Sequence, residues 1–125
     1  MELSLDIIYD SEPEQAAAHV LTYFRQEFAK PFPPPKSLSR EEKNLMEQID
    51  AAFDGVTLED GIGLMTTQLL DMYAPREVCA AVAPCEERSD WRRITPAMIR
   101  ACWDALNFTD PKGYRFLLPA WLTLD

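Results

Sequence analysis

The chain has 125 residues, of which 47% are hydrophobic and 26% charged, and its formal net charge is −9. This length and composition are typical of one globular domain, which can bury roughly two thirds of the surface that its unfolded chain exposes. The negative charge argues against nucleic acid as a partner, because affinity for a phosphate backbone comes largely from Lys and Arg.

The first segment, "LSLDIIYD" at residues 3–10, alternates between apolar and polar residues and then becomes apolar. This pattern fits a short strand or an extended arm. The chain starts without the basic region, apolar stretch and cleavage site of a secretory signal. No apolar run approaches the roughly 18 residues that cross a bilayer. We therefore expect a cytoplasmic protein without membrane association.

A helix is predicted from Pro13 to about Lys30, because Ser11 and Glu14 have capping-box spacing and Pro13 suits a first turn. His19, the one histidine, falls on the flank of this helix, where a structural role is favoured over a ligand or base. The apolar residues that share one face are Ala17, Val20, Leu21, Phe24 and Phe28.

The segment "PFPPPK" at 31–36 ends this helix, since proline lacks the amide that a helix needs. It favours a stiff linker over a proline-rich peptide ligand. A second helix follows, because Ser39 and Glu42 again have capping-box spacing and Gly55 suits its carboxyl end. Its apolar stripe is Leu45, Met46, Ile49, Ala52 and Phe53.

Three further helices are indicated. "LMTTQLLDMYA" at 64–74 is helical up to Pro75, and residues 76–90 are helical only at their start. Thr95 and Pro96 form an N-cap and first-turn pair. The apolar positions that follow at helical spacing are Met98, Ile99, Cys102, Trp103 and Leu106.

The closing block "FTDPKGYRFLLPAWL" at 108–122 predicts a final helix, capped by Thr109 or Asp110 and bent at Pro119. Its expected buried stripe is Tyr114, Leu117, Leu118, Trp121 and Leu122. Arg115 lies beside this stripe, where an ion pair is favoured over a ligand-binding role. The nearby candidate carboxylates are Asp90, Asp104 and Asp110.

These elements predict a mainly α fold: a compact bundle of about five helices in one domain spanning 1–125, with the short N-terminal strand or extended arm as an open feature. Residues 1–38 would supply a helix and the proline-rich linker, and residues 39–125 the helical core. The three cysteines carry no metal-ligand or redox spacing, so we expect reduced, mostly buried thiols and neither metal nor cofactor.

The segments "IDAAFDGVTLEDGIGLMTTQLLDMY", "DWRRI" and "ALNFTDPKGYRFLLPAWL" resemble an uncharacterised family of small bacterial proteins, a domain of unknown function. The resemblance covers about residues 49–122 and is most specific in the closing block, of the form "FxDxxGfRfxLPAyL". Trp121 stands where the family usually has tyrosine. The resemblance implies no mechanism, although relatives near toxin–immunity clusters hint at an immunity role. The motif residues that we take as structural are Trp91, Asp110, Gly113, Arg115, Pro119 and Trp121.

Charge is unevenly distributed: residues 1–90 carry 18 acids and 7 bases, whereas residues 91–125 carry 3 acids and 5 bases. The first hypothesis is therefore an acidic interaction protein, with an immunity or inhibitor protein that covers a basic partner and attracts it electrostatically as its particular form. The candidate partner-binding residues are Asp50, Asp54, Glu59, Asp60 and Asp71.

Two other hypotheses stay open. One is a structural domain that forms homo-oligomers through Phe32 and the proline segment. The other is a small enzyme with a pocket near Arg115 and Trp91, which we rank last because the chain has no recognisable catalytic motif.

Overall fold

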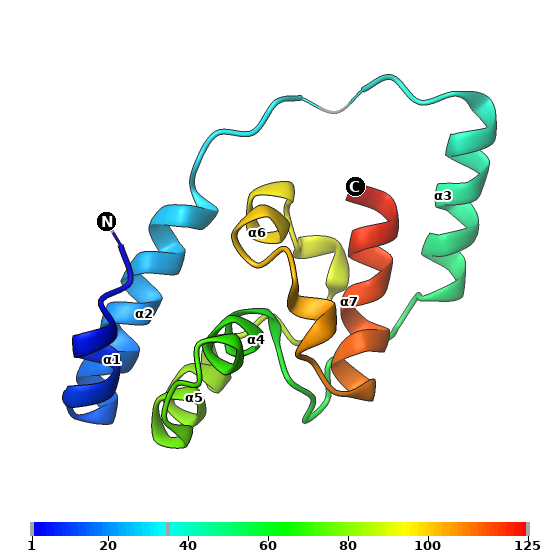
Figure 1. The fold of residues 1–125 in the computed structure, drawn as a ribbon. Helices are drawn as coiled ribbons and strands as arrows, with labels where there is room; N and C mark the ends of the chain where they lie inside the picture. The colour runs from blue at the N-terminus through cyan, green and yellow to red at the C-terminus, as the bar shows by residue number, and fades with distance from the viewer. Residues whose placement is uncertain (1, 35, 125) are drawn as a thin grey trace.

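The computed structural model describes residues 2–34 and 36–124, and all regular structure in these two ranges is helical (Figure 1). The α-helices are α1 (Leu5–Asp10), α2 (Pro13–Phe28), α3 (Arg40–Ala52), α4 (Leu64–Asp71), α5 (Arg76–Val82), α6 (Pro96–Ala101) and α7 (Pro111–Leu124). The short 3-10 helices are η1 (Ala83–Cys85), η2 (Trp91–Arg93) and η3 (Ala105–Asn107). The mainly α prediction is confirmed, with seven α-helices in the described part rather than about five.

The N-terminal segment forms α1, so the prediction of a strand or extended arm is wrong. The Ser4 hydroxyl accepts a hydrogen bond from the Ile7 amide, which caps the helix. The Ser4 amide donates to Nε2 of His19 at 2.9 Å, and Ile8 is fully buried. Helix formation here depends on docking against α2, which the short sequence pattern could not reveal.

Helix α2 is the central N-terminal element and packs against α1, α5 and α6. Its predicted apolar face is confirmed at Val20 and Phe24, both of which are buried. The predicted capping box is wrong, because Ser11 ends α1 and Glu12 takes the N-cap position of α2 without a side-chain hydrogen bond.

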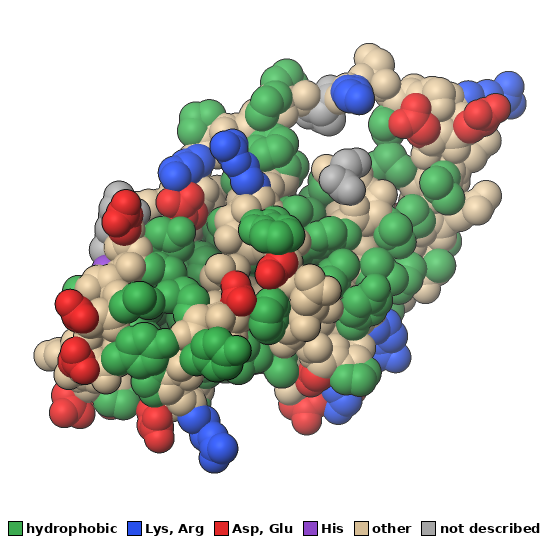
Figure 2. Space-filling view, viewed as in Figure 1, with side chains coloured by type: hydrophobic (Ala, Val, Ile, Leu, Met, Phe, Trp, Pro, Cys, Tyr) green, Lys and Arg blue, Asp and Glu red, His purple; other side chains and the backbone are tan. Residues whose placement is uncertain are grey.

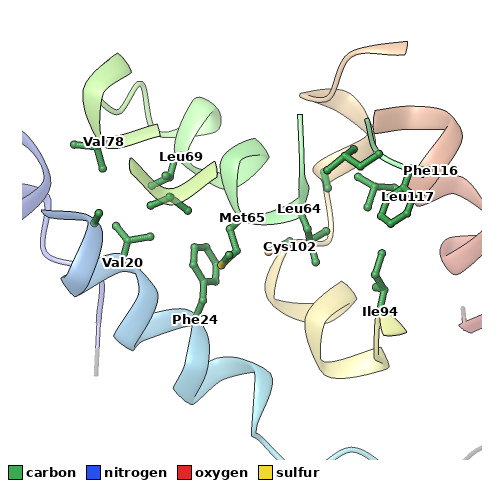
Figure 3. Close-up of a cluster of buried hydrophobic side chains, with 14 of the residues drawn as sticks. Val20, Phe24, Leu64, Met65, Leu69, Val78, Ile94, Cys102, Phe116 and Leu117 are labelled. Atoms are coloured by element: carbon green, nitrogen blue, oxygen red, sulfur yellow. The ribbon is translucent and has the colours of Figure 1, made fainter. Parts of the chain in front are cut away.

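The core runs between α2 and α7, with α4 in the middle (Figure 3). The side chains that Figure 3 shows along this line are Val20 and Phe24 of α2, Leu64, Met65 and Leu69 of α4, and Phe116 and Leu117 of α7. Because one apolar cluster includes side chains from both ends of the chain, the N-terminal helices contribute to the same core as the closing block.

The proline segment is an exposed connection from α2 to α3, which lies on the opposite side of the molecule (Figure 1). Pro35, one of the prolines of the predicted linker, lies outside the described residues. The Ser39 and Glu42 capping box is confirmed. However, α3 contributes no buried residue to the described structure, and Leu45 of its predicted stripe is 56% exposed.

Helix α6 is shorter than the sequence predicted. The Thr95 cap is confirmed, since the Thr95 hydroxyl accepts a hydrogen bond from the Met98 amide. The helix ends at Ala101, and the chain then turns through Cys102 into η3. Trp103 is therefore 71% exposed instead of sharing the buried face.

Helix α7 spans the predicted closing block and includes Pro119. Its buried face differs from the predicted stripe, because Tyr114 is 45% and Leu122 is 51% exposed. A Cβ on Gly113 would lie 1.8 Å from Oγ1 of Thr109, so the helix can approach the preceding loop only on its glycine side. The residues buried on this face are Gly113, Phe116, Leu117, Pro119 and Ala120.

Candidate functional site

Asp50 and Asp54, two of the candidate partner-binding residues, lie at the carboxyl end of α3 and contact Arg92 of η2. Nε of Arg92 is 2.5 Å from Oδ1 of Asp50, and Nη2 is 3.1 Å from Oδ1 of Asp54. Asp90 approaches the same guanidinium at 3.5 Å. The two carboxylates thus help to attach α3, and their charge is partly neutralised within the chain.

Trp91 is the second part of this attachment. Its ring is buried, and its Nε1 donates to the carbonyl oxygen of Phe53 at 3.0 Å. The guanidinium carbon of Arg92 lies 4.7 Å from the centre of the Trp91 ring, a cation–π arrangement. The structural role predicted for Trp91 is consistent with these contacts.

Glu59 and Asp60 are also paired within the chain, in this case with α7. Oε2 of Glu59 lies 3.0 Å from Nη2 of Arg115, and Oδ1 of Asp60 lies 2.5 Å from Nζ of Lys112. The hydrogen bond from Lys112 lowers the pKa of the Asp60 carboxyl. Arg115 therefore forms the predicted ion pair, but its partner is none of the three carboxylates that the sequence suggested.

Asp110 joins α7 to the loop before α4. Its Oδ1 accepts hydrogen bonds from the amides of Gly113 at 2.8 Å and Ile62 at 3.1 Å. Thr109 reinforces this junction by donating from its hydroxyl to the carbonyl of Ile62 at 2.7 Å. Of the remaining motif residues, Pro119 is buried and Trp121 packs against the core.

Asp71 differs from the other four candidate residues, because no ion pair involves it in the described part of the chain. It ends α4, where the hydroxyl of Tyr9 in α1 donates a hydrogen bond to the carbonyl of Met72. This contact places Asp10, which follows Tyr9, near the same end of the molecule. Figure 2 shows several acidic side chains along this edge, at lower left.

Two exposed tyrosines accompany these acids. Tyr73 is 88% exposed and Tyr9 is 45% exposed. We call the four residues Tyr9, Asp10, Asp71 and Tyr73 the acidic tyrosine surface. Leu5 and Leu70, at helical spacing from the two tyrosines, are exposed by 53% and 37% and extend its apolar area. Of these residues, only Asp71 was a candidate from the sequence. The expected helix over residues 64–74 included Tyr73, whereas α4 ends at Asp71 and leaves Tyr73 in the turn that follows.

The backbone of Tyr73 is unusual. Its φ is 56°, in the left-handed region that favours glycine. The amides of Tyr73 and Ala74 donate to the carbonyls of Leu70 and Leu69, which is the hydrogen-bond pattern of a Schellman motif at a helix end. Tyrosine thus occupies the position where this motif usually has glycine, and its side chain points into solvent.

Two grooves adjoin the core. One has a volume of about 380 Å³ and is lined by residues of α3, η2 and α7, including Trp91, Arg92 and Asp50. Arg115 is not among its lining residues, so Trp91 and Arg115 do not share this groove as the enzyme hypothesis required. The other groove, of about 760 Å³, lies between α2 and the segment from Cys85 to Met98.

Glu86 lines the larger groove and is 8% exposed. Its two carboxylate oxygens accept hydrogen bonds from the amides of Met65 and Thr66, both at 2.9 Å, in the first turn of α4. Burial raises the pKa of this carboxyl, and the two amides oppose the rise. This long-range cap could not be predicted from a local pattern, because 20 residues separate Glu86 from Thr66.

The cysteines are free: Cys102 is buried, Cys79 is half-buried and Cys85 is exposed. The expectation that most of these thiols are buried is therefore met only in part. Burial raises the pKa of the Cys102 and Cys79 thiols. In residues 2–34 and 36–124, no cluster of three or more His, Cys, Asp or Glu side chains could hold a metal ion. Over the same ranges, each helix is too short or too polar to span a membrane.

The chain belongs to the Family of unknown function (DUF6714), whose profile matches residues 41–125. The predicted resemblance to an uncharacterised domain is thus confirmed, and the match includes α3 to α7 but not α1 and α2. No significant match was found among curated proteins or among solved structures.

Proposed function

We propose that this protein is an interaction domain that binds a basic protein partner through the acidic tyrosine surface. The observation that carries this proposal is Tyr73, a large aromatic residue held in a backbone conformation that suits glycine and exposed to solvent. Backbone strain of this kind costs on the order of 1 to 3 kcal/mol and is concentrated at functional sites. A purely structural helix end would be more stable with glycine.

The composition of this surface supports protein binding. Tyrosine is enriched at the centres of protein interfaces, where its ring fills a pocket and its hydroxyl finds a hydrogen-bond partner. Asp10 and Asp71 would form a charged rim that attracts a basic partner and raises the association rate, as would the net charge of −9. The four other candidate acids are less suited, since Arg92, Arg115 and Lys112 already pair with them.

An immunity or inhibitor role, with a basic nuclease-type toxin as partner, is the particular form of this proposal that the family resemblance suggests. As an immunity protein, this chain would bind the toxin and protect the host by covering the toxin's cationic active surface. The partner would be recovered at low salt and lost as salt rises, because screening weakens the attraction between exposed charges.

The test is affinity capture of the tagged protein from a lysate of its host at low and at physiological salt, followed by mass spectrometry. We expect one stoichiometric basic protein, captured by the wild type and lost with Tyr73→Gly. Trp103→Ser is the matched control, because it removes another largely exposed aromatic side chain, from the turn after α6. Equal loss with both variants, or no basic partner, would show that this surface is not the interface.

Charge variants test whether the partner is attracted by the acids of the acidic tyrosine surface or by the net negative charge of the whole chain. Asp10→Asn combined with Asp71→Asn removes two charges from the acidic tyrosine surface. Glu41→Gln combined with Glu47→Gln removes the same number from exposed positions of α3. We expect only the first pair to weaken capture, whereas equal weakening by both pairs would indicate nonspecific attraction.

Self-association is the alternative function, and Phe32 is the residue that keeps it open. Phe32 is 45% exposed on the segment between α2 and α3. Light scattering at high protein concentration distinguishes the alternatives: a monomer argues against self-association, and a dimer that Phe32→Ser dissociates supports it.

A further inference from the structure

The larger groove combines an apolar wall with a basic rim. It has a volume of about 760 Å³, within the range of roughly 300 to 1,000 Å³ that is common for small-molecule sites. Leu21, Phe24 and Phe28 of α2 line one side, and Ile94 and Met98 line the other. Because α2 supplies one side, the groove exists only while the N-terminal helix is docked.

Three arginines line this groove: Arg25, Arg88 and Arg93. Arg25 is exposed and forms no ion pair among the described residues. Arg93 is 70% exposed, and its single ion pair, with Glu87, is loose at 3.7 Å. These two cations are therefore available to a ligand.

Arg88 is held in place rather than neutralised. It donates hydrogen bonds to the carbonyls of Glu59 at 2.9 Å, Gly61 at 3.4 Å and Ala83 at 2.9 Å. A guanidinium has five N–H donors, so two remain without a partner in the described part of the chain. Neutral carbonyls orient this side chain, and it forms no ion pair among the described residues, although its charge acts at longer range on the carboxyl of Glu86.

The two acids of the groove are held by backbone amides, as Arg88 is held by carbonyls. Both oxygens of Glu86 accept from amides of α4, and Oε2 of Glu87 accepts from the amides of Ser89 and Asp90. Three arginines against two such acids make this groove locally cationic in a chain of net charge −9. The charge complementarity therefore favours an anion.

We propose that this groove binds an amphipathic anion, namely a carboxylate on an apolar chain, for which decanoate is the probe. The carboxylate lies at Arg25 and Arg88, which can offer paired N–H donors. The apolar chain lies against Phe24, Phe28 and Met98. This site is separate from the acidic tyrosine surface, so either proposal can fail without the other.

The methionine methyl groups report on this site directly. Met65 and Met98 line the larger groove, Met46 lines the smaller groove, and Met72 lines neither. We would titrate sodium decanoate into the full chain labelled with ¹³C at the methionine methyls and follow the shifts by NMR. The expected result is saturable movement of Met65 and Met98, with Met46 and Met72 unchanged.

Variants test the role of charge. Arg25→Met is expected to weaken decanoate binding about tenfold, because it removes a charge-assisted contact. Arg100→Met is the matched control, since this exposed arginine of α6 does not line the groove. Decanol, which lacks the carboxylate, should bind at least about tenfold more weakly than decanoate.

Four results would overturn the proposal. The first is that decanoate leaves Met65 and Met98 unmoved at millimolar concentration, and the second is that it moves Met46 and Met72 equally. The third is that decanol binds as tightly as decanoate, which would make the groove merely apolar. Equal weakening by Arg25→Met and Arg100→Met would attribute binding to overall charge. None of these outcomes depends on capture of a protein partner.

Discussion

Tyr73 combines an unfavourable backbone conformation with an exposed aromatic side chain. It occupies the C′ position of a Schellman motif with φ of 56°, and its side chain is 88% exposed. Replacing it with glycine removes almost no buried surface but relieves the left-handed strain. The contacts of the folded chain therefore give no stabilising reason for a tyrosine at this position, which is why we base the proposed interaction surface on it.

Tyr73→Gly is expected to raise the free energy of unfolding by about 1 kcal/mol, because glycine adopts the left-handed conformation without a Cβ clash. Chemical denaturation followed by circular dichroism measures this change. Tyr73→Ala keeps the strain and is the control, with little expected gain. If the glycine variant is less stable than the wild type, the side chain makes a stabilising contact and the functional interpretation of Tyr73 fails.

Glu86 should make stability depend on pH. Burial raises its pKa in the folded chain above the ordinary value of 4.5. For an acid with a raised folded-state pKa, the stabilising contribution is complete below the unfolded pKa and is lost as pH rises through the folded pKa. The carboxyl therefore favours folding most below the ordinary pKa of 4.5, and this contribution falls as pH rises above that value.

Glu86→Gln isolates this dependence, because glutamine stays neutral. We expect the Tm of the wild type, relative to that of the variant, to fall as pH rises from about 4 to about 7. Thermal denaturation of both proteins at several pH values measures this difference in Tm. The other titratable groups are the same in both proteins, so their contributions cancel in the difference. A difference that is constant with pH would mean that the folded and unfolded chains ionise Glu86 alike.

At the scale of the element, α3 is the most weakly held of the longer helices. It contributes no buried residue among those described, and it is attached at its carboxyl end through Asp50, Asp54 and the carbonyl of Phe53. Its amino end depends on the capping box of Ser39 and Glu42. Helices with little buried surface open at low free energy.

Hydrogen exchange should therefore be fastest, among α2, α3 and α7, in α3. Ser39→Ala should lower the local opening free energy of α3 by about 1 kcal/mol, since it removes an N-cap. The amides of α2 serve as the internal control and should keep their protection. Protection of α3 equal to that of α2 would show that the helix is stabilised by more than these contacts.

At the scale of the whole molecule, the family profile and the core have different boundaries. The profile begins at residue 41, whereas the apolar cluster includes Val20 and Phe24 of α2. Burial of such side chains contributes roughly 1.5 to 3 kcal/mol each. A chain of residues 39–125 would expose Val78 and Val82 of α5, which belong to the same cluster and to a helix that α2 packs against.

Residues 39–125 alone are therefore expected not to fold cooperatively, and a peptide of residues 2–30 added in trans should restore a thermal transition. Circular dichroism during heating measures both effects. The same peptide with Phe24→Ser is the control and should not rescue the fold. If residues 39–125 show a cooperative transition at a Tm near that of the whole chain, the predicted single domain of 1–125 is wrong.

Local sequence signals predicted the helices well where caps and prolines mark them. The starts at Pro13, Arg40, Pro96 and Pro111 follow from such residues, and the mainly α class follows from helical periodicity. Which face of α7 is buried could not be predicted from these local signals. Two apolar stripes overlap in its sequence, and the buried one is the one that brings Gly113 against Thr109 and places Phe116 and Leu117 in the core.

The candidate site was only partly predictable. Asp71 was identified from its charge, and Asp50, Asp54, Glu59 and Asp60 have the same charge but contact bases that lie 38 to 56 residues away. A sequence pattern reports charge, whereas the neutralisation of charge depends on which segments meet in space. Trp103 shows the same limit, since its exposure depends on where α6 ends.

The sequence by itself determined the helical class, most helix starts, the acidic character and the family relationship, because these depend on composition and on residues a few positions apart. Only the tertiary structure decided which acids remain unpaired, which face of α7 is buried and how α2 completes a groove with Arg88 and Met98. These properties arise from contacts between distant segments, and packing selects them only when the whole chain is folded.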